Sequence, residues 1–250
     1  MGFELSKIYA VWLREVKRYT NSKARMVSSL GMPLLFLAAL GGGLSAMMPG
    51  FNYEGFILPG ILAMSVLFTS ISSGVSIIWD REFGFLKEML AAPATRQTLV
   101  IGRTLGGATT AIIQGVIILV LGFLITGTAV PSLLSIAGIF VMLIMLSCFL
   151  VSVGICFASL IQEVETFQLI MNLVVMPLFF LSNALFPINR MPEWLQVISQ
   201  LNPISYTVDG LRILMLGSGT FSIWMDIGVS IGTLIVGVVA ASYLFSKTSI

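Results

Sequence analysis

The side chains able to do chemistry are concentrated in one short stretch of this sequence. Residues 79–96, WDREFGFLKEMLAAPATR, form a charge-dense block with six charged residues that lies between two long apolar runs. The chain contains no His, the commonest general base and metal ligand. It also has no G-x-x-x-x-G-K-[ST] motif for binding nucleotide phosphates. We therefore expect no catalytic residue, no metal site and no cofactor bound by this chain, and we expect any energy to come from a partner.

Residues 80–90 of this block predict a short helix with two faces. Its apolar face consists of Phe83, Leu86, Met89 and Leu90, which fall at helical spacing. Acidic residues stand near the helix start, where the helix dipole favours them, and Pro93 ends the helix. An apolar knob within a charged rim is typical of a protein docking surface. A second interpretation stays open, in which this helix rests on the membrane surface or packs against the N-terminal helix.

Composition favours a membrane protein. Hydrophobic residues make up 57% of the chain and charged residues 10%, whereas an ordinary soluble domain has about 25% charged residues. Mean hydropathy is +1.03, so polar side chains are too few to cover a soluble globule. We predict an all-α polytopic membrane protein with a single domain over residues 1–250. The net charge of only +2 gives no footprint for nucleic acid.

Six apolar segments are long enough to cross about 30 Å of hydrocarbon. They are residues 28–48, 56–78, 99–125, 133–161, 166–186 and 223–245. Gly102 and Gly106 form a small-xxx-small pair that favours close helix contact. The segment centres carry essentially no ionisable side chain, which argues against an ion-coupled transporter. Their Ser and Thr residues have no evident activating base, which argues against an intramembrane protease.

Residues 3–18 predict an amphipathic helix with an apolar stripe and a charged face that includes Glu15. A basic helix that carries Trp and Tyr suits the plane of a membrane interface. We assign residues 1–25 to a cytoplasmic interface helix, with candidate residues Trp12, Arg14, Lys17 and Arg18. An ordinary amphipathic helix packed on protein remains the alternative.

Residues 187–222 form the longest connection between apolar segments and are only moderately polar. We expect two short interfacial or re-entrant helices, about 191–200 and 205–216, separated by a break at Asn202 and Pro203. A plain extracytoplasmic loop is the alternative. Most Lys and Arg residues fall on the other side of the membrane by alternation. The positive-inside rule therefore predicts that both termini and residues 79–96 are cytoplasmic.

Two motifs together resemble the membrane-spanning permease subunits of type-2 ABC exporters, which export drugs, lipids or polysaccharides. The first is residues 79–96, with an aromatic residue, an acidic-Arg-Glu run, a Gly and a later Pro. The second is residues 181–212, LSNALFPINRMPEWLQVISQLNPISYTVDGLR. It carries Phe186, Pro187, Pro192, Asn202, Pro203, Asp209 and Arg212. The resemblance covers the whole chain.

The resemblance implies an N-terminal interface helix, six spanning helices, a coupling helix between the second and third, and two re-entrant helices before the sixth. It implies two paired permease copies, a homodimer here, in the cytoplasmic membrane and in contact with its lipid. Separate ABC ATPase subunits would bind ATP and Mg and contact the coupling helix. Carried over, the coupling residues are Arg81, Glu82, Phe83, Gly84, Leu86, Lys87 and Glu88. The family's path is lined by the first, second and fifth spans, and its candidate lining residues here are Phe36, Phe68, Phe179 and Phe180.

The predicted function is therefore that of a permease subunit moving a hydrophobic or amphipathic substrate, such as a drug, a lipid or a lipid-linked glycan, out of the cytoplasm. An ion-coupled carrier or channel is one alternative, and it would transport without ATP or a partner. A membrane scaffold or sensor is another, and it would move no substrate.

Overall fold

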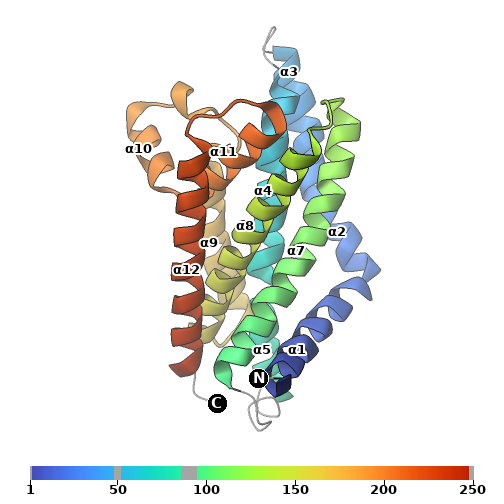
Figure 1. Cartoon of the computed structure of the whole chain (residues 1–250), viewed down its shortest axis with the longest axis vertical. Coiled ribbons are helices and arrows are strands. Elements are labelled where there is room, and N and C mark those ends of the chain that lie inside the picture. The colour runs from blue at the N-terminus through green and yellow to red at the C-terminus, as the bar shows by residue number, and fades with distance from the viewer. Residues whose placement is uncertain (1, 48–51, 86–94, 248–250) are drawn as a thin grey trace.

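The chain is helical throughout the residues that its computed structural model describes, which are 2–47, 52–85 and 95–247. In chain order the helices are α1 (Gly2–Thr20), α2 (Lys23–Phe36), η1 (Leu37–Gly42), α3 (Gly43–Met47), α4 (Tyr53–Ser72), α5 (Val75–Glu82), α7 (Arg96–Thr126), α8 (Leu133–Leu160), α9 (Val164–Phe180), η2 (Ile188–Arg190), α10 (Glu193–Leu201), α11 (Pro203–Leu216) and α12 (Ile223–Lys247). Figure 1 shows an elongated bundle with α10 and α11 at its upper end. The predicted all-α class is confirmed for this part of the chain.

Five helical segments among the described residues are long and apolar enough to cross a membrane. They are Met26–Met47, Tyr53–Glu82, Arg96–Thr126, Leu133–Leu160 and Ile223–Lys247. These segments match five of the six predicted spans. The start of α1, the end of α5, the start of α7 and the end of α12 all lie at the lower end of the bundle (Figure 1). The chain therefore starts at the lower end, returns to it at the end of α5, and ends there with α12.

The predicted span over residues 166–186 is not confirmed as a spanning helix. Here α9 has 17 residues and ends at Phe180, so it is about 25 Å long and shorter than the roughly 30 Å hydrocarbon layer. The helix stops because the next residues fold back into the protein. Asn183 has a φ of 31°, and residues 182–185 are all buried. The upper end of the bundle is therefore closed by irregular chain together with α10 and α11.

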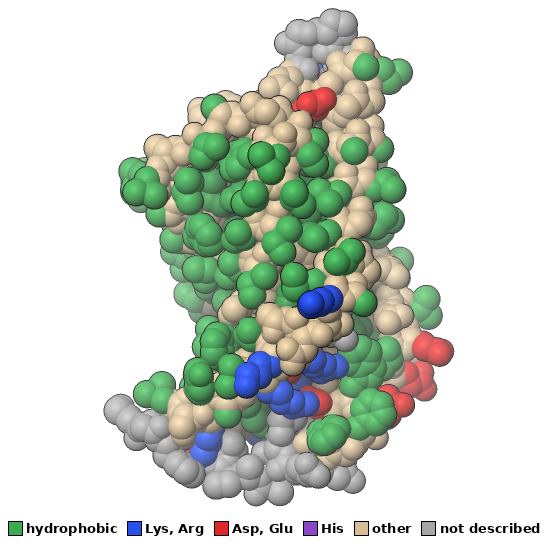
Figure 2. Space-filling view, turned by 90° about the vertical axis from the view of Figure 1, so that its right-hand side faces the viewer, with side chains coloured by type: hydrophobic (Ala, Val, Ile, Leu, Met, Phe, Trp, Pro, Cys, Tyr) green, Lys and Arg blue, Asp and Glu red, His purple; other side chains and the backbone are tan. Residues whose placement is uncertain are grey.

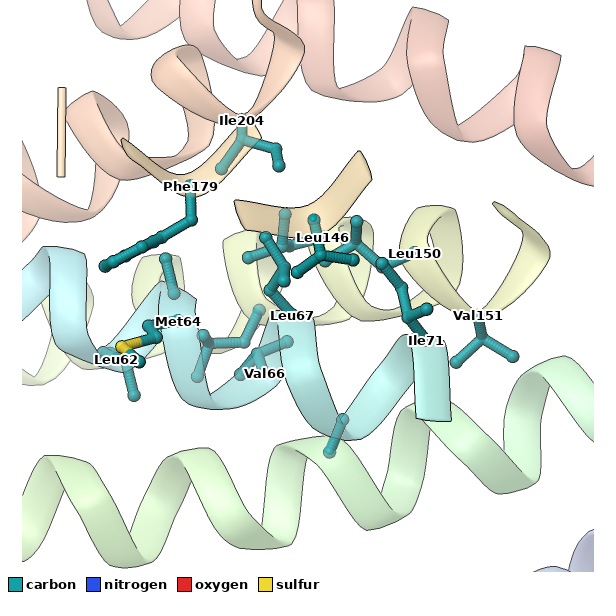
Figure 3. Packing of buried hydrophobic residues seen from close by; sticks show 14 of the residues in the cluster. Leu62, Met64, Val66, Leu67, Ile71, Leu146, Leu150, Val151, Phe179 and Ile204 are labelled. Atoms are coloured by element: carbon teal, nitrogen blue, oxygen red, sulfur yellow. The ribbon is translucent and has the colours of Figure 1, made fainter. Parts of the chain in front are cut away.

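The core is built around α4, whose side chains are buried on nearly every face. A helix that is apolar all round is stable only when neighbours surround it, and here α7, α8 and α11 pack against α4. Figure 3 shows Leu67 and Ile71 of α4 near Leu146 and Leu150 of α8, with Phe179 close by. This central position explains why the second apolar segment contains both small and large apolar residues but no charge before Asp80.

Two close backbone contacts bring other elements against this central segment. A Cβ atom on Gly60 would lie 2.3 Å from the carbonyl oxygen of Ala184. A Cβ atom on Gly74, in the break between α4 and α5, would lie 2.6 Å from the carbonyl oxygen of Gly154 in α8. Only glycine permits these approaches. The second predicted span is therefore two helices, α4 and α5, separated at Ser73 and Gly74.

Apolar side chains cover the outer surface of the bundle. On the face that Figure 2 shows, hydrophobic groups occupy the middle, and Lys and Arg gather in a band toward the lower end. Exposed apolar patches of this extent on a soluble protein would be aggregation sites. Hydrocarbon is the solvent that such a surface fits. The fold therefore agrees with the multi-pass membrane protein that the composition predicts.

Candidate coupling region and cavity

Asp80, at the lower end of α5, joins three helices through its carboxylate. The side chain is buried, with a relative exposure of 3%. Arg103 of α7 donates from Nη2 to Asp80 Oδ2 at 2.5 Å, and Arg14 of α1 donates from Nη2 to Asp80 Oδ1. Arg103 also donates from Nη1 to Ser76 Oγ at 3.2 Å. We call Arg14, Asp80 and Arg103 the charge triad.

The two ion pairs of the charge triad differ in burial. The Arg103 side chain is 3% exposed, whereas the Arg14 side chain is 38% exposed. Removing one partner of a buried ion pair costs about 3–5 kcal/mol, because the remaining charge is left without water. An exposed pair contributes about 0–1 kcal/mol. Arg103–Asp80 therefore fixes α5 to α7, and Arg14–Asp80 is a weaker link that can rearrange at lower cost.

Two further arginines hold the ends of the chain segment between α5 and α7. Arg81 donates to the carbonyl oxygens of Ile161 at 3.1 Å and Ala158 at 3.3 Å. Arg96 donates to the carbonyl oxygen of Ser246 at 2.5 Å. These carbonyls lie at the C-terminal ends of α8 and α12, where a helix has unpaired acceptors and its dipole favours cations. The segment thus leaves and re-enters the bundle at two fixed points.

The predicted coupling residues are described only in part. Glu82 is exposed, and Phe83 and Phe85 are 69% and 51% exposed. Gly84 has a φ of 78°, a left-handed conformation that glycine adopts without strain. Leu86, Lys87 and Glu88 lie outside the described residues. Among the described coupling residues, Arg81 donates hydrogen bonds to carbonyl oxygens of the protein, whereas Glu82 and Phe83 are exposed.

The predicted interface helix α1 packs closely along α7. Gly102 and Gly106 of α7 face it: a Cβ atom at these positions would lie 2.8 Å from Val11 Cβ and 2.7 Å from Glu15 Cβ. Trp12 donates from Nε1 to Thr109 Oγ1 at 3.0 Å. The predicted close helix contact at the glycine pair is therefore present, and its partner is α1. Packing on protein, the alternative interpretation of residues 3–18, holds for this face of the helix.

The remaining faces of α1 carry exposed and charged residues. Leu5 and Tyr9 are 65% and 57% exposed, and Lys17 is exposed. At the helix start, Lys7 donates to Glu4 at 2.8 Å and the Thr98 hydroxyl donates to the same carboxylate. The Lys7 hydrogen bond and then the Thr98 hydrogen bond lower the pKa of Glu4. These contacts attach the start of α1 to the start of α7.

A cavity of about 560 Å³ lies between α1, α2, α4, α5, α7 and α9. Its wall combines apolar and uncharged polar side chains, with two charged residues, Glu15 and Arg18, contributed by α1. The guanidinium carbon of Arg18 lies 4.9 Å from the centroid of the Trp79 ring, a distance at which a cation is attracted to the ring face. Pockets of this volume, largely apolar with a few polar groups, are typical small-molecule sites.

Gln114 of α7 organises the polar part of the cavity wall. Its Oε1 accepts from Tyr19 at 3.1 Å and from Thr69 at 2.8 Å. Its Nε2 donates to the carbonyl oxygen of Ser29 at 2.8 Å. That carbonyl needs another donor because Pro33, four residues later, has no N–H with which to continue the helical ladder. One amide therefore ties α1, α2 and α4 to α7 around the cavity.

The four predicted path residues occupy different environments. Phe36 and Phe68 line the cavity. Phe179 is 1% exposed and belongs to the hydrophobic core, and Phe180 is 44% exposed. The cavity wall also includes residues from the first, second and fifth predicted spans, which are the spans that the resemblance implies for the path.

The second sequence motif forms a buried polar cluster at the upper end. Asp209 Oδ2 accepts from the backbone N–H groups of Thr220 at 2.7 Å and Phe221 at 2.8 Å. Its Oδ1 accepts from Asn183 Nδ2 at 3.0 Å and from Arg212 Nη1 at 3.4 Å. The Arg212 guanidinium carbon lies 4.1 Å from the centroid of the Phe56 ring of α4. This cluster fixes the chain after α9 and the chain before α12 to the central helix.

The other residues of this motif begin or connect the short helices. Asn202 Oδ1 accepts from the N–H of Ile204, and Asn202 Nδ2 donates to the carbonyl oxygen of Leu178 at 2.6 Å. Pro203 is the first residue of α11, a position that suits proline because its missing N–H would have no helical partner. Pro187 and Pro192 precede η2 and α10, and Phe186 is 51% exposed.

Comparison with known proteins identifies the family of the chain. A family model described as ABC-2 type transporter matches residues 6–216. The chain belongs to the ABC-2 type transporter family. The matched range includes most of α1, the charge triad, the residues that line the cavity, and Asn183, Asp209 and Arg212 of the polar cluster.

Several transport permeases are similar over most of the chain. The putative transport permease ycf38 of Porphyra purpurea is 31% identical, covering 84% of this chain and 74% of its own. Nodulation protein J of Rhizobium leguminosarum bv. viciae is 27% identical, covering 88% and 86%. The probable multidrug ABC transporter permease YbhR of Escherichia coli K12 is 27% identical, covering 70% of this chain and 47% of its own. This ABC-2 protein is thus a transport permease component, and the resemblance inferred from its motifs is confirmed.

Three polar residues that organise these sites, Gln114, Asn183 and Glu15, are not among the site residues predicted from the sequence. Gln114 and Asn183 interrupt apolar runs, a signal that could have identified them, because a polar group inside a span needs a partner. Glu15 was assigned to the charged face of residues 3–18, but it is 9% exposed and faces α7. That assignment was wrong because helical periodicity shows which residues share a face and not how many faces become buried.

Proposed function

We propose that this chain is the membrane-spanning subunit of an ATP-driven exporter whose ATP is hydrolysed by separate ABC ATPase subunits. Those subunits would bind ATP and Mg and would contact Arg81, Glu82, Phe83, Gly84, Leu86, Lys87 and Glu88. Two copies of the chain would pair in the cytoplasmic membrane, in contact with its lipid, with both termini and this coupling segment on the cytoplasmic side. The printed name of one relative, a probable multidrug ABC transporter permease, supports a small-molecule cargo.

The observation that carries this proposal is the charge triad. Asp80 lies next to the coupling segment on α5 and binds arginines from α1 and α7. Helices α1 and α7 both contribute to the cavity wall, through Tyr19 and Gln114 among others. A push on the coupling segment would therefore act directly on two walls of the cavity. The exposed Phe83 and Phe85 side chains supply an apolar surface for the ATPase, as docking sites require.

The cargo proposed for the cavity is hydrophobic or amphipathic, such as a drug, a lipid or a lipid-linked glycan. Phe36 and Phe68 offer apolar surface, and Ser65, Thr69 and Asn172 offer hydrogen-bonding groups. Phe179 and Phe180, which do not line this cavity, would have to meet cargo elsewhere along the path or in another conformation.

Co-purification with the ATPase tests the docking part of the proposal. The triple variant Glu82→Ala, Phe83→Ala and Leu86→Ala should lose the bound ATPase. A matched control is Glu193→Ala, Trp194→Ala and Leu201→Ala, which removes similar side chains from α10 at the other end of the bundle and should retain the ATPase. If the first triple variant binds the ATPase as the wild type does, the coupling segment has been assigned wrongly. Transport by the chain alone, driven by an ion gradient, would contradict the proposed energy source.

A further inference from the structure

The cavity wall contains one carboxylate whose hydrogen bonding is incomplete. Glu15 of α1 is 9% exposed, and its Oε1 atom has no hydrogen-bond partner among the described residues. Glu15 is also the one acidic residue in the cavity lining of the described chain. A buried carboxylate oxygen without a donor is costly, because it has lost its water and gained nothing in exchange.

Several buried polar groups around the cavity already have partners. Ser65 donates to the carbonyl oxygen of Leu62 at 2.9 Å, Ser73 to that of Ser70 at 2.6 Å, and Thr110 to that of Gly107 at 2.8 Å. The Gln114 amide is bonded on both its oxygen and its nitrogen. Among the buried side-chain nitrogen and oxygen atoms of the cavity lining, Glu15 Oε1 is the one without a hydrogen-bond partner in the described chain.

The position of Glu15 is fixed, which suits it to recognition. A Cβ atom on Gly106 would lie 2.7 Å from Glu15 Cβ, so the residue is held against the backbone of α7. Arg18, three residues later in α1, lies over the Trp79 ring, where a cation is attracted to the ring face. A side chain held in place by a neighbouring backbone loses little conformational entropy when it binds a ligand.

The rest of the cavity would hold an apolar body. Met32, Phe36, Met64, Phe68 and Met171 contribute to its lining. Methionine side chains are flexible and polarisable, so they adapt to apolar ligands of different shape. A ligand that satisfies both parts of the wall has an apolar body and a positively charged hydrogen-bond donor at one end.

We propose that the cavity binds amphipathic amines, with the ligand's ammonium group donating to the Glu15 carboxylate and its apolar body lying among Phe36, Phe68 and the neighbouring methionines. This assignment rests on the proposed function, in which the cavity receives cargo, and it names the chemical class of that cargo. Glu15 is then a specificity-determining residue contributed by the N-terminal helix.

The test measures ligand binding to the purified full-length chain in lipid nanodiscs. The probes are monodansylcadaverine, which has an apolar dye and a primary ammonium group, and its N-acetyl derivative, which keeps the dye and chain but is neutral. Dissociation constants come from dansyl fluorescence, with protein-free nanodiscs subtracted. A charge-assisted hydrogen bond of this kind corresponds to about a tenfold or larger difference in affinity. The wild type should therefore bind the amine at least tenfold more tightly than the acetyl derivative.

The variant Glu15→Gln keeps the shape of the side chain and removes its charge, so it should abolish this preference while binding the acetyl derivative as the wild type does. Glu193→Gln, an exposed acid on α10, is the matched control and should leave the preference intact. The proposal is overturned if the wild type binds the amine no better than the acetyl derivative, if it binds neither, or if Glu15→Gln weakens both probes equally. The assay needs no ATPase, so its failure leaves the docking test untouched. A failed docking test with an intact amine preference would overturn only the assignment of the coupling segment.

Discussion

Replacing Asp80 with Ala should destabilise this protein more than any other single loss of charge in the lower half of the bundle. The substitution leaves Arg103, whose side chain is 3% exposed, without the carboxylate that it contacts at 2.5 Å. Loss of one partner from a buried pair costs about 3–5 kcal/mol. Loss of the Arg14–Asp80 pair adds at most about 1 kcal/mol to this cost, because the Arg14 side chain is 38% exposed and water screens the charges. The expected total loss in unfolding free energy is therefore about 3–6 kcal/mol.

Reversible unfolding of the purified chain in mixed micelles, followed by circular dichroism, gives this free energy. Three further variants separate the contributions. Arg14→Ala should cost no more than about 1 kcal/mol. Glu82→Ala, an exposed acid on the same helix, should change stability by about 0.5 kcal/mol or less. The double variant Asp80→Asn with Arg103→Met should recover most of the loss, since it removes both buried charges together.

Two results would contradict a buried ion pair between Asp80 and Arg103. In the first, Asp80→Ala lowers the unfolding free energy no more than Arg14→Ala does. In the second, the double variant is as unstable as Asp80→Ala. The first result would mean that the Asp80 site is open to water. The second would mean that the loss comes from packing around α5 and not from a stranded charge. In the proposed complex with an ATPase, Arg14→Ala should lower the transport rate although it costs no more than about 1 kcal/mol of unfolding free energy, because it removes the ion pair between α1 and α5.

Three other substitutions test close packing and buried charge with the same unfolding measurement. Gly60→Ala should destabilise the protein by several kcal/mol, because the new Cβ atom would lie 2.3 Å from the Ala184 carbonyl oxygen and the backbone must shift. The control Gly228→Ala in α12, whose Cβ atom would meet nothing within 4 Å, should be neutral or slightly stabilising. Equal effects of the two substitutions would contradict the close approach at Gly60. Asp226→Asn should leave the unfolding free energy unchanged or raise it. The residue is buried, and both its carboxylate oxygens lack a hydrogen-bond partner in the described chain. A large loss of stability would reveal a donor or bound cation at this position. Asp209→Ala should lower the unfolding free energy by about 3–5 kcal/mol, because it removes the carboxylate that accepts from Arg212 and from two backbone N–H groups. A loss below about 1 kcal/mol would show that the polar cluster is dispensable.

The long helices were predictable because hydropathy is a local property. A run of about twenty apolar residues is a spanning candidate whatever surrounds it, and the observed bounds of α7, α8 and α12 lie within three residues of the predicted ones. The exception, α9, ends at Phe180 although the next residues are also largely apolar. Its end depends on Asn183 and Asp209, which are 26 residues apart in the sequence. No local pattern contains that information.

The candidate site divides in the same way. The sequence by itself determined the class of protein, the charge-dense segment over residues 79–96 and the glycine pair at 102 and 106, because composition, charge density and spacing are properties of neighbouring residues. The tertiary structure alone decided that the glycine pair receives α1, that Asp80 binds both Arg14 and Arg103, and that Phe36 and Phe68 line a cavity from which Phe179 is absent. Glu15 illustrates the reason most clearly: its position in the helix is written in the sequence, but its burial depends on how closely α7 approaches, which is fixed by contacts about ninety residues away in the chain, such as that between Trp12 and Thr109.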